Sequence, residues 1–170
     1  MFNLSQLQVT VAAANDSGVV SFTDIDEIAR YAMPGVIETN LVWSFQKVPD
    51  LPGYIGGVPS DTGFAEKGET NIGMICFPAH SAGKLDLHDA MGEGSLVVDA
   101  NDSSMHKSNT VDIEIVISGK IDIVLESGET RTLVPGNCLV MGGVMHAWKN
   151  HYGDDCIVAI VVAGASGTVK

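Results

Sequence analysis

The sequence has few basic residues. It carries 21 acidic side chains against only 9 lysines and arginines, which gives a formal net charge of -12. Arg30 and Arg131 are the only arginines, and basic residues do not cluster anywhere along the chain. A surface this negative repels phosphate backbones and anionic lipid headgroups. We therefore expect neither nucleic acid nor a membrane surface to be a partner.

The cysteine patterns of metal and disulfide sites are also absent. Cys76, Cys138 and Cys156 show no C-x-x-C spacing, and the last two lie in apolar, strand-like runs. We expect buried free thiols, as in a reducing compartment, rather than a disulfide or a zinc cluster. No lysine or arginine precedes Arg30 and no long apolar run occurs, so neither a signal peptide nor a membrane span is expected. These features predict a cytoplasmic protein.

Long helical periodicity is missing as well. The chain has 170 residues, 19 of them glycine, and 45% hydrophobic content, which is typical of a single packed domain over residues 1–170. From residue 110 onward, short apolar runs alternate with glycine- and proline-containing turns. This spacing indicates antiparallel strands closed into a barrel or stacked as a sandwich.

The first hundred residues show a looser pattern. Residues 7–13 and 19–22 read as two strands around a turn, and residues 41–48 and 71–78 as two further strands. Between them, Thr23 is a candidate helix cap, and a short helix is predicted from there to about Pro34. Two long irregular stretches, 49–70 and 79–104, follow. The first either covers the mouth of a pocket or runs along the outside of the fold.

The segment from residue 106 to 118 alternates strictly between polar and apolar side chains. In a strand, every second residue shares a face. One face therefore carries His106, Ser108, Thr110, Asp112 and Glu114, and the other carries Val111, Ile113, Ile115 and Ile117. The polar face is either solvent-exposed or the lining of a pocket.

Two spaced motifs favour the pocket. The segment resembles the first motif of the cupin family, roughly G-x5-H-x-H-x(3,4)-E-x6-G. His106 stands at the first histidine, Ser108 at the second, Asp112 at the glutamate, and Gly119 at the final glycine. The second cupin motif, G-x5-P-x-G-x2-H-x3-N, resembles residues 136–150. The matching positions there are Gly136, Gly143, His146 and Asn150, with Met141 in place of proline and one residue closer to Gly136 than in the motif.

This resemblance implies an all-β fold, the double-stranded β-helix or jelly-roll barrel. Residues 105–163 would form the motif-bearing core of the barrel, and residues 1–104 would add N-terminal strands, the short helix and loops. It also implies that the motif face points into the barrel, so that His106, Ser108, Asp112 and Glu114 line the interior with His146. The isoleucine face would then lie outside, too apolar to remain in water. Either a second copy of the chain covers it, which predicts a homodimer, or strands from residues 1–48 cover it within one chain.

The resemblance further implies a metal site. His106, Asp112 and His146 would bind a divalent ion, and such mixed donors suit iron, manganese, nickel or zinc. Glu114 would be a general base with a pKa raised by burial. Trp148, two residues past His146 and so on the same strand face, either forms the floor of a pocket for a flat, apolar substrate or is ordinary aromatic core packing. Two acids and two histidines unpaired in a barrel would be costly, so a cation or protons must compensate.

Three functions stay open on these residues. The first is a metal-dependent enzyme acting on a small molecule, such as a dioxygenase, decarboxylase, dehydratase or isomerase. The second is a metal-free enzyme using acid/base pairs, and the third is a non-catalytic module that binds a small metabolite. Lys84 and Lys107 either attract an anionic substrate or are simply solvated. His80 and His88 are expected to be solvated loop residues.

Overall fold

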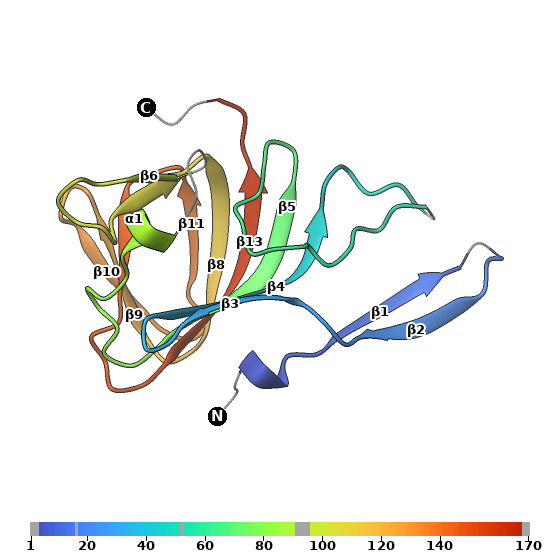
Figure 1. Cartoon of the computed structure of the whole chain (residues 1–170), viewed down its shortest axis with the longest axis horizontal. Helices are drawn as coiled ribbons and strands as arrows, with labels where there is room; N and C mark the ends of the chain where they lie inside the picture. The colour runs from blue at the N-terminus through green and yellow to red at the C-terminus, as the bar shows by residue number, and fades with distance from the viewer. Residues whose placement is uncertain (1–3, 16, 52, 91–95, 168–170) are drawn as a thin grey trace.

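The protein is a barrel of two antiparallel sheets (Figure 1), and the computed structural model describes residues 4–15, 17–51, 53–90 and 96–167. The larger sheet has the order β11 (Cys138–Gly142), β8 (Thr110–Ser118), β13 (Cys156–Gly164), β5 (Thr70–Phe77), β4 (Ile37–Phe45) and β3 (Ala29–Met33). The smaller sheet has the order β10 (Thr130–Leu133), β9 (Ile121–Leu125), β12 (His146–Lys149), β7 (His106–Ser108) and β6 (Leu96–Val98). The predicted all-β jelly roll is confirmed.

The core lies between these two sheets. Val116, Val158 and Phe77 from the larger sheet and Ile121 from the smaller one belong to a single buried cluster. Only two short helical segments accompany the sheets in the described residues, α1 (Leu87–Ala90) and a 3-10 turn (Leu4–Gln6). None of the described helices is long and apolar enough to cross a membrane.

A hairpin precedes the barrel. Strands β1 (Val9–Ala14) and β2 (Val20–Ile25) pair only with each other in the described structure, as the sequence predicts, and form a separate two-stranded sheet. The hairpin extends away from the barrel in Figure 1. It therefore adds an arm to the barrel rather than a layer.

The short helix predicted from Thr23 onward is wrong. Thr23 lies within β2, and the following residues form β3, which pairs with β4 around a turn at Pro34 and Gly35. Exposure alternates along β3, which is the period of a strand. Gly35 adopts a positive φ of 72°, which suits a tight hairpin turn. The few apolar residues in this stretch fit helical and strand spacing equally, and pairing with β4 decides between them.

Strand β8 confirms the predicted alternation. Asp112 and Glu114 are only 8% and 7% exposed, whereas Ile113 and Ile115 are 38% and 41% exposed. The polar side chains therefore face the barrel interior and the isoleucines face outward. Charged groups and isoleucines alternate strictly along this strand because one of its faces lines the barrel interior and the other lies on the outside.

Two motif residues have clear structural roles. Gly119 has a positive φ of 73°, and a Cβ there would collide with the backbone of Asp155. The Asn150 side-chain amide donates hydrogen bonds to the carbonyls of Phe77, at 2.9 Å, and Asp154, at 3.0 Å. These contacts hold the β12–β13 turn against the end of β5.

All three cysteines are free thiols, as predicted. Cys156 is buried and Cys76 is partly buried, and burial raises the pKa of Cys156 to about 12 and that of Cys76 to about 11. The prediction that Cys138 is buried is wrong, because Cys138 lies on β11, the edge strand of the larger sheet, and is exposed.

Candidate functional site

A cavity of about 530 Å³ lies in the barrel between the two sheets. The motif residues His106, Asp112 and His146 line it, together with Glu114 and Trp148. All five predicted site residues therefore share one cavity. The smaller sheet supplies the two histidines and Trp148, and the larger sheet supplies the two acids.

The two histidines form a pair. His106 on β7 and His146 on β12 are direct cross-strand partners, which places their side chains on the same face of the sheet. Their ring centroids are 4.4 Å apart, and both side chains are buried. Residues forty positions apart in the chain are thus in contact because their strands are neighbours.

Backbone carbonyls set the tautomer of both imidazoles. The His106 Nδ1 lies 3.0 Å from the Ser104 carbonyl oxygen, and the His146 Nδ1 lies 2.9 Å from the Val144 carbonyl oxygen. A carbonyl oxygen only accepts hydrogen bonds, so each Nδ1 carries the proton and donates it. In the neutral ring, the Nε2 atom then keeps its lone pair. This is the tautomer that metal-ligating histidines commonly use.

Both rings are neutral at physiological pH. Burial lowers the pKa of His146 to about 4, and the neighbouring His106 lowers it further in the same direction. Burial also lowers the pKa of His106. Each ring therefore presents an uncharged Nε2 donor rather than an imidazolium.

The pKa values of the two carboxyl groups in the cavity are raised rather than lowered. Burial and the negative charge of Asp112 raise the pKa of Glu114 to about 8, and burial raises the pKa of Asp112. Asp112 Oδ1 and Glu114 Oε2 are buried and accept no hydrogen bond within the described structure. A buried carboxylate oxygen without a partner is costly, so the cavity favours a proton or a cation beside these atoms.

Ser108, at the position of the second motif histidine, supports this acidic group instead. Its hydroxyl lies 2.6 Å from the Thr110 hydroxyl, and the Thr110 hydroxyl in turn hydrogen-bonds to Asp112 and partly offsets its raised pKa. Ser108, Thr110 and Asp112 thus form a chain of polar contacts along the inner face of β7 and β8. Ser108 lacks the imidazole of the motif histidine, but its side chain remains inside the barrel.

The three predicted metal ligands, His106, Asp112 and His146, do not form one group in the structure. Within the described residues, no three histidine, cysteine, aspartate or glutamate side chains form a group that could hold a metal ion. The histidine pair and the acid pair come from facing sheets, which explains why they remain two separate groups. The rings of His106 and His146 are in contact with each other.

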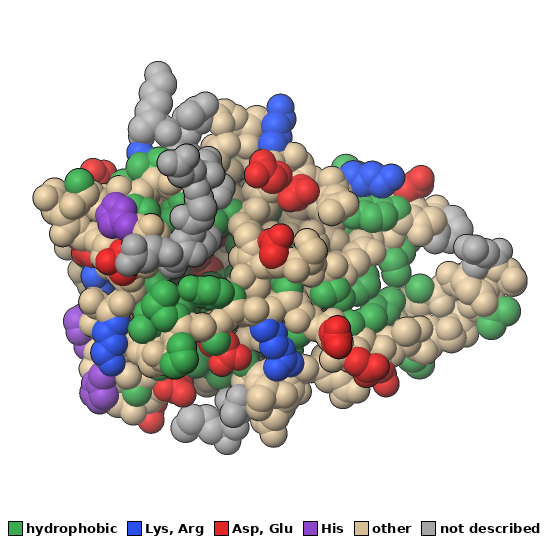
Figure 2. Space-filling model, viewed as in Figure 1, with side chains coloured by type: hydrophobic (Ala, Val, Ile, Leu, Met, Phe, Trp, Pro, Cys, Tyr) green, Lys and Arg blue, Asp and Glu red, His purple; other side chains and the backbone are tan. Residues whose placement is uncertain are grey.

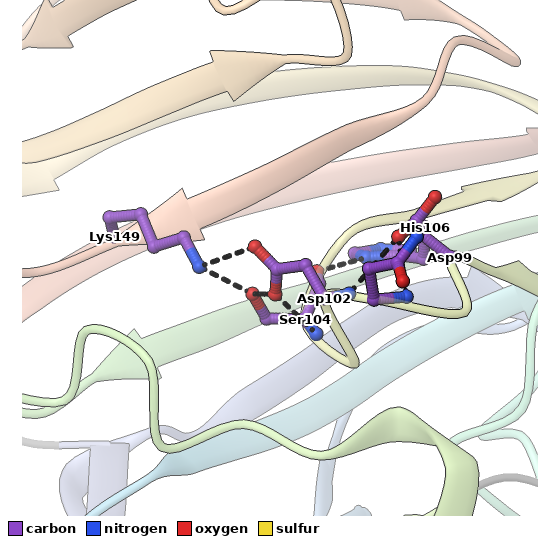
Figure 3. A network of polar contacts seen from close by, with 6 residues as sticks. Asp99, Asp102, Ser104, His106 and Lys149 are labelled. Atoms are coloured by element: carbon purple, nitrogen blue, oxygen red, sulfur yellow. Dashed lines mark hydrogen bonds and ion pairs between the residues drawn. The ribbon is translucent and has the colours of Figure 1, made fainter.

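A polar network outside the cavity holds the His106 ring (Figure 3). The Lys149 Nζ donates to Ser104 Oγ at 2.6 Å and to Asp102 Oδ2 at 3.2 Å, and the Ser104 hydroxyl donates to Asp102 Oδ1. These bonds, first that from Ser104, lower the pKa of Asp102. Because the Ser104 carbonyl accepts the His106 Nδ1 proton, the network fixes the acceptor that determines the His106 tautomer.

Replacing Lys149 by methionine should therefore loosen His106 without affecting His146. We expect the Nε2-protonated form of His106 to become detectable by 15N NMR, with a loss of about 1 kcal/mol in stability. Lys149→Arg should restore the wild-type spectrum because it keeps the donors. His146 is the internal control, since its carbonyl partner, Val144, lies outside the network. An unchanged His106 spectrum in Lys149→Met would contradict a positioning role.

Several cavity residues are not apparent from the sequence. Residues 61–64, from the long irregular stretch, line the cavity, and so do Tyr31, Phe77 and Asn71. The Asn71 side-chain amide donates to the Gly63 carbonyl at 3.1 Å and ties this loop to β5. Residues 61–64, which we call the covering loop, thus line the cavity, whereas the rest of stretch 49–70 is absent from its described lining. The Gly- and Pro-rich composition of that stretch is the only sequence signal that points to them.

The other candidates lie elsewhere. Lys84 and Lys107 are absent from the described cavity lining. His80 and His88 are exposed, as predicted, but His88 lies in α1 rather than in a loop; the His80 Nδ1 lies 3.2 Å from the His151 carbonyl oxygen. None of these four residues contributes a side chain to the cavity.

Known proteins match parts of the chain. It is 43% identical over 49 residues to phomopsin biosynthesis cluster protein D of Diaporthe leptostromiformis, covering 29% of this chain and 26% of that protein. It is 40% identical over 48 residues to the cupin-domain-containing oxidoreductase srdB of Neurospora crassa, covering 28% and 24%. It is 38% identical over 105 residues to oryzines biosynthesis cluster protein J of Aspergillus oryzae, covering 48% and 59%. The matches thus span between about a quarter and three fifths of these relatives.

Solved cupin structures are also similar to this chain. An RmlC-like cupin from Shewanella frigidimarina has a TM-score of 0.48 and 11% identity, covering 83% of this chain and 87% of that one. The cupin domain of Schizosaccharomyces pombe Cnp3 has a TM-score of 0.47 and 10% identity, covering 94% and 88%. No protein-family model matches the chain. Its motif residues nevertheless meet inside a jelly-roll barrel, and relatives named as cupin-domain-containing oxidoreductases match part of its sequence.

Proposed function

We propose that this chain is a cupin-type enzyme that acts on a small molecule in its cavity with the help of a divalent metal ion. The observation that supports this proposal best is the tautomer of the histidine pair. Two neutral imidazoles, each with its Nδ1 proton on a carbonyl, keep two Nε2 lone pairs beside each other in one cavity. A first-row divalent ion is the partner that such a pair suits.

The negative charges of Asp112 and Glu114 also suit a divalent ion in this cavity. Asp112 and Glu114 have buried oxygens without hydrogen-bond partners, and together they would balance a divalent charge. The two imidazoles are the donors that the structure brings together, and Asp112, from the facing sheet, is the proposed third ligand. Iron, manganese, nickel or zinc would suit this donor set. When bound, such an ion would polarise a substrate oxygen as a Lewis acid.

Two further residues have proposed roles. Glu114 is protonated in the metal-free protein near neutral pH, because its pKa is about 8, and a bound divalent ion would favour its carboxylate, the form that acts as a general base. Trp148 packs against Phe77 with ring centroids 5.5 Å apart and presents a flat wall to the cavity. Among the reaction classes that the motifs leave open, relatives named as oxidoreductases favour an oxidation or reduction.

A metal-free acid/base enzyme is the second candidate. It is favoured by the inverted ionisation of the site, in which a carboxyl with a pKa of about 8 lies in the same cavity as an imidazole with a pKa of about 4. Between these values, Glu114 is an acid and His146 is a free base. Such a pair can move protons without any ion.

Metal binding distinguishes the two candidates. Protein purified without an affinity tag and reconstituted with zinc, nickel or manganese should bind one ion per chain, and saturation should raise the Tm by several degrees. His146→Ala should abolish both effects and leave the fold intact, because the side chain lines a cavity. His88→Ala, which removes an exposed histidine, is the matched control and should bind as the wild type does.

If the wild-type protein binds no ion after reconstitution, or His146→Ala binds it equally well, the metal proposal fails. The acid/base proposal then takes its place, and turnover would be sought in chelator.

A further inference from the structure

The cavity wall is largely apolar and aromatic apart from the motif residues. Phe64 from the covering loop, Phe77 from β5 and Trp148 from β12 contribute rings, and leucine and isoleucine side chains fill much of the rest. Phe77 and Trp148 also belong to or pack against the buried core, so this part of the wall is preformed. A preformed wall of rings favours a ligand with a flat, apolar body.

The charged groups of the wall all have the same sign. Among the described residues that line the cavity, Asp61, Asp112 and Glu114 are acidic and none is lysine or arginine. Lys149 lies on the strand that carries His146 and Trp148, but Asp102 and Ser104 bind its ammonium group outside the cavity lining (Figure 3). No described cation is therefore available to pair with an anionic ligand in the cavity.

A divalent ion would not change this balance. Its two positive charges would be matched by the carboxylates of Asp112 and Glu114, which leaves no net positive charge for a ligand. Bringing an anion into an apolar cavity without a counter-charge is strongly unfavourable. An uncharged polar group avoids this cost and can still hydrogen-bond to the imidazoles or the carboxyls.

The covering loop contributes to the same selection. Asp61 Oδ1 accepts a hydrogen bond from the Gly63 backbone N–H at 2.9 Å, and Asn71 holds the Gly63 carbonyl. These two contacts fix the turn that immediately precedes Phe64. The aromatic ring therefore reaches the cavity from an anchored loop.

We propose that the cavity selects uncharged small molecules with a flat apolar body and a neutral oxygen function, and excludes their carboxylates. This inference rests on the proposed function for the identity of the site, but it concerns only which ligands the wall admits. Of the two roles that the sequence leaves open for Lys84 and Lys107, it favours solvated side chains over the attraction of an anionic substrate.

Two probes of the same shape test it. Naphthalene-2-methanol and 2-naphthoate should be titrated into the wild-type protein at pH 7 by isothermal titration calorimetry, once in chelator and once with saturating zinc. We expect the alcohol to bind at least about 10-fold more tightly than the carboxylate in both conditions. Phe64→Ala should weaken binding of the alcohol about 5-fold or more. Phe22→Ala, which removes an exposed ring outside the described lining, is the matched control and should leave binding unchanged.

Equal or tighter binding of 2-naphthoate in either condition would overturn the inference. So would the absence of binding by the alcohol, because the flat apolar body is part of the claim. If only the experiment with zinc fails, because the protein does not bind the metal, the result counts against the proposed metal-dependent function. The preference measured in chelator would then still decide the ligand class.

Discussion

Replacing Glu114 by glutamine should remove most of the loss of stability that the metal-free protein shows as the pH rises from 6.5 to 9. Glu114 is buried among apolar groups beside Asp112, and its pKa is raised from 4.5 to about 8. The folded protein therefore holds this proton more tightly than the unfolded chain does. Glutamine keeps the shape of the side chain but cannot ionise.

The sign follows from proton linkage. Because the folded pKa lies above the unfolded one, the stability that the neutral Glu114 contributes is fully present below pH 4.5 and is lost as the pH rises through about 8. The histidines act in the opposite direction, since their lowered pKa values cost stability only as the pH falls below about 6.5. From pH 6.5 to 9 the carboxyl dominates, and the wild-type free energy of unfolding should fall by about 2 kcal/mol.

Denaturant unfolding in chelator at pH 6.5, 7.5 and 9 measures this loss. Chelator is needed because a bound cation would favour the ionised carboxylate. Glu129→Gln is the control, because Glu129 is exposed and pairs with Arg131 at the surface, and it should keep the wild-type slope. A wild-type stability that stays flat over this range would show that Glu114 is already ionised in the folded protein.

Strand β8 shows how much of the site could be predicted from the sequence. Its period of two residues predicts which side chains face inward, and the spacing of two motifs predicts that His106 and His146 share a cavity. Both follow from local rules, because alternation and turn spacing are properties of short segments. The structure bears out the shared cavity through direct cross-strand pairing.

The distance between the acids and the histidines could not be predicted in this way. Asp112 lies on the larger sheet and His106 on the smaller one, and facing sheets lie about 10 Å apart. Whether side chains from both sheets meet depends on the packing of the whole barrel, which no motif spacing encodes. The same holds for Phe64, whose place in the cavity depends on a tertiary contact between Asn71 and Gly63.

The wrong prediction of a helix after Thr23 and the wrong prediction that Cys138 is buried have a related cause. The stretch after Thr23 has too few apolar residues to separate a period of 3.6 from a period of 2, and pairing with β4 settles it. Cys138 lies in an apolar run, but the run becomes an edge strand whose outer face is open. In both cases the partner strand, rather than the local sequence, decides the outcome.

The outer face of β8 leads to the second large effect, which is on assembly. The apolar row on this strand stays exposed in the single chain: Val111, Ile113, Ile115 and Ile117. Near it, Leu7 and Val9 help to form a shallow apolar groove with Ile113 and Ile115. Figure 2 shows hydrophobic side chains along the side of the molecule from which the hairpin extends. An apolar surface of this kind is typical of a contact between protein chains.

The β1–β2 hairpin also leaves large apolar side chains exposed to water. Phe22 is 80% exposed and Val20 is 74% exposed, and a two-stranded hairpin is marginally stable in water by itself. A second copy of the chain would cover the apolar face of β8 and support the hairpin at once. We therefore expect a homodimer in which these two surfaces are buried.

The double substitution Ile113→Asp and Ile115→Asp should convert this dimer to a monomer at micromolar concentration. Each change places a charge on the proposed contact, where burying it without a partner costs several kcal/mol in total, enough to raise the dimer Kd at least about 100-fold. Both side chains already face solvent within one chain, so the barrel should keep its fold. Val97→Asp is the matched control, because Val97 is 45% exposed but lies on the smaller sheet. Sedimentation velocity should show the wild-type protein and the control as dimers and the double variant as a monomer. A wild-type protein that sediments as a monomer at these concentrations would mean that water, rather than a second chain, covers the isoleucine row.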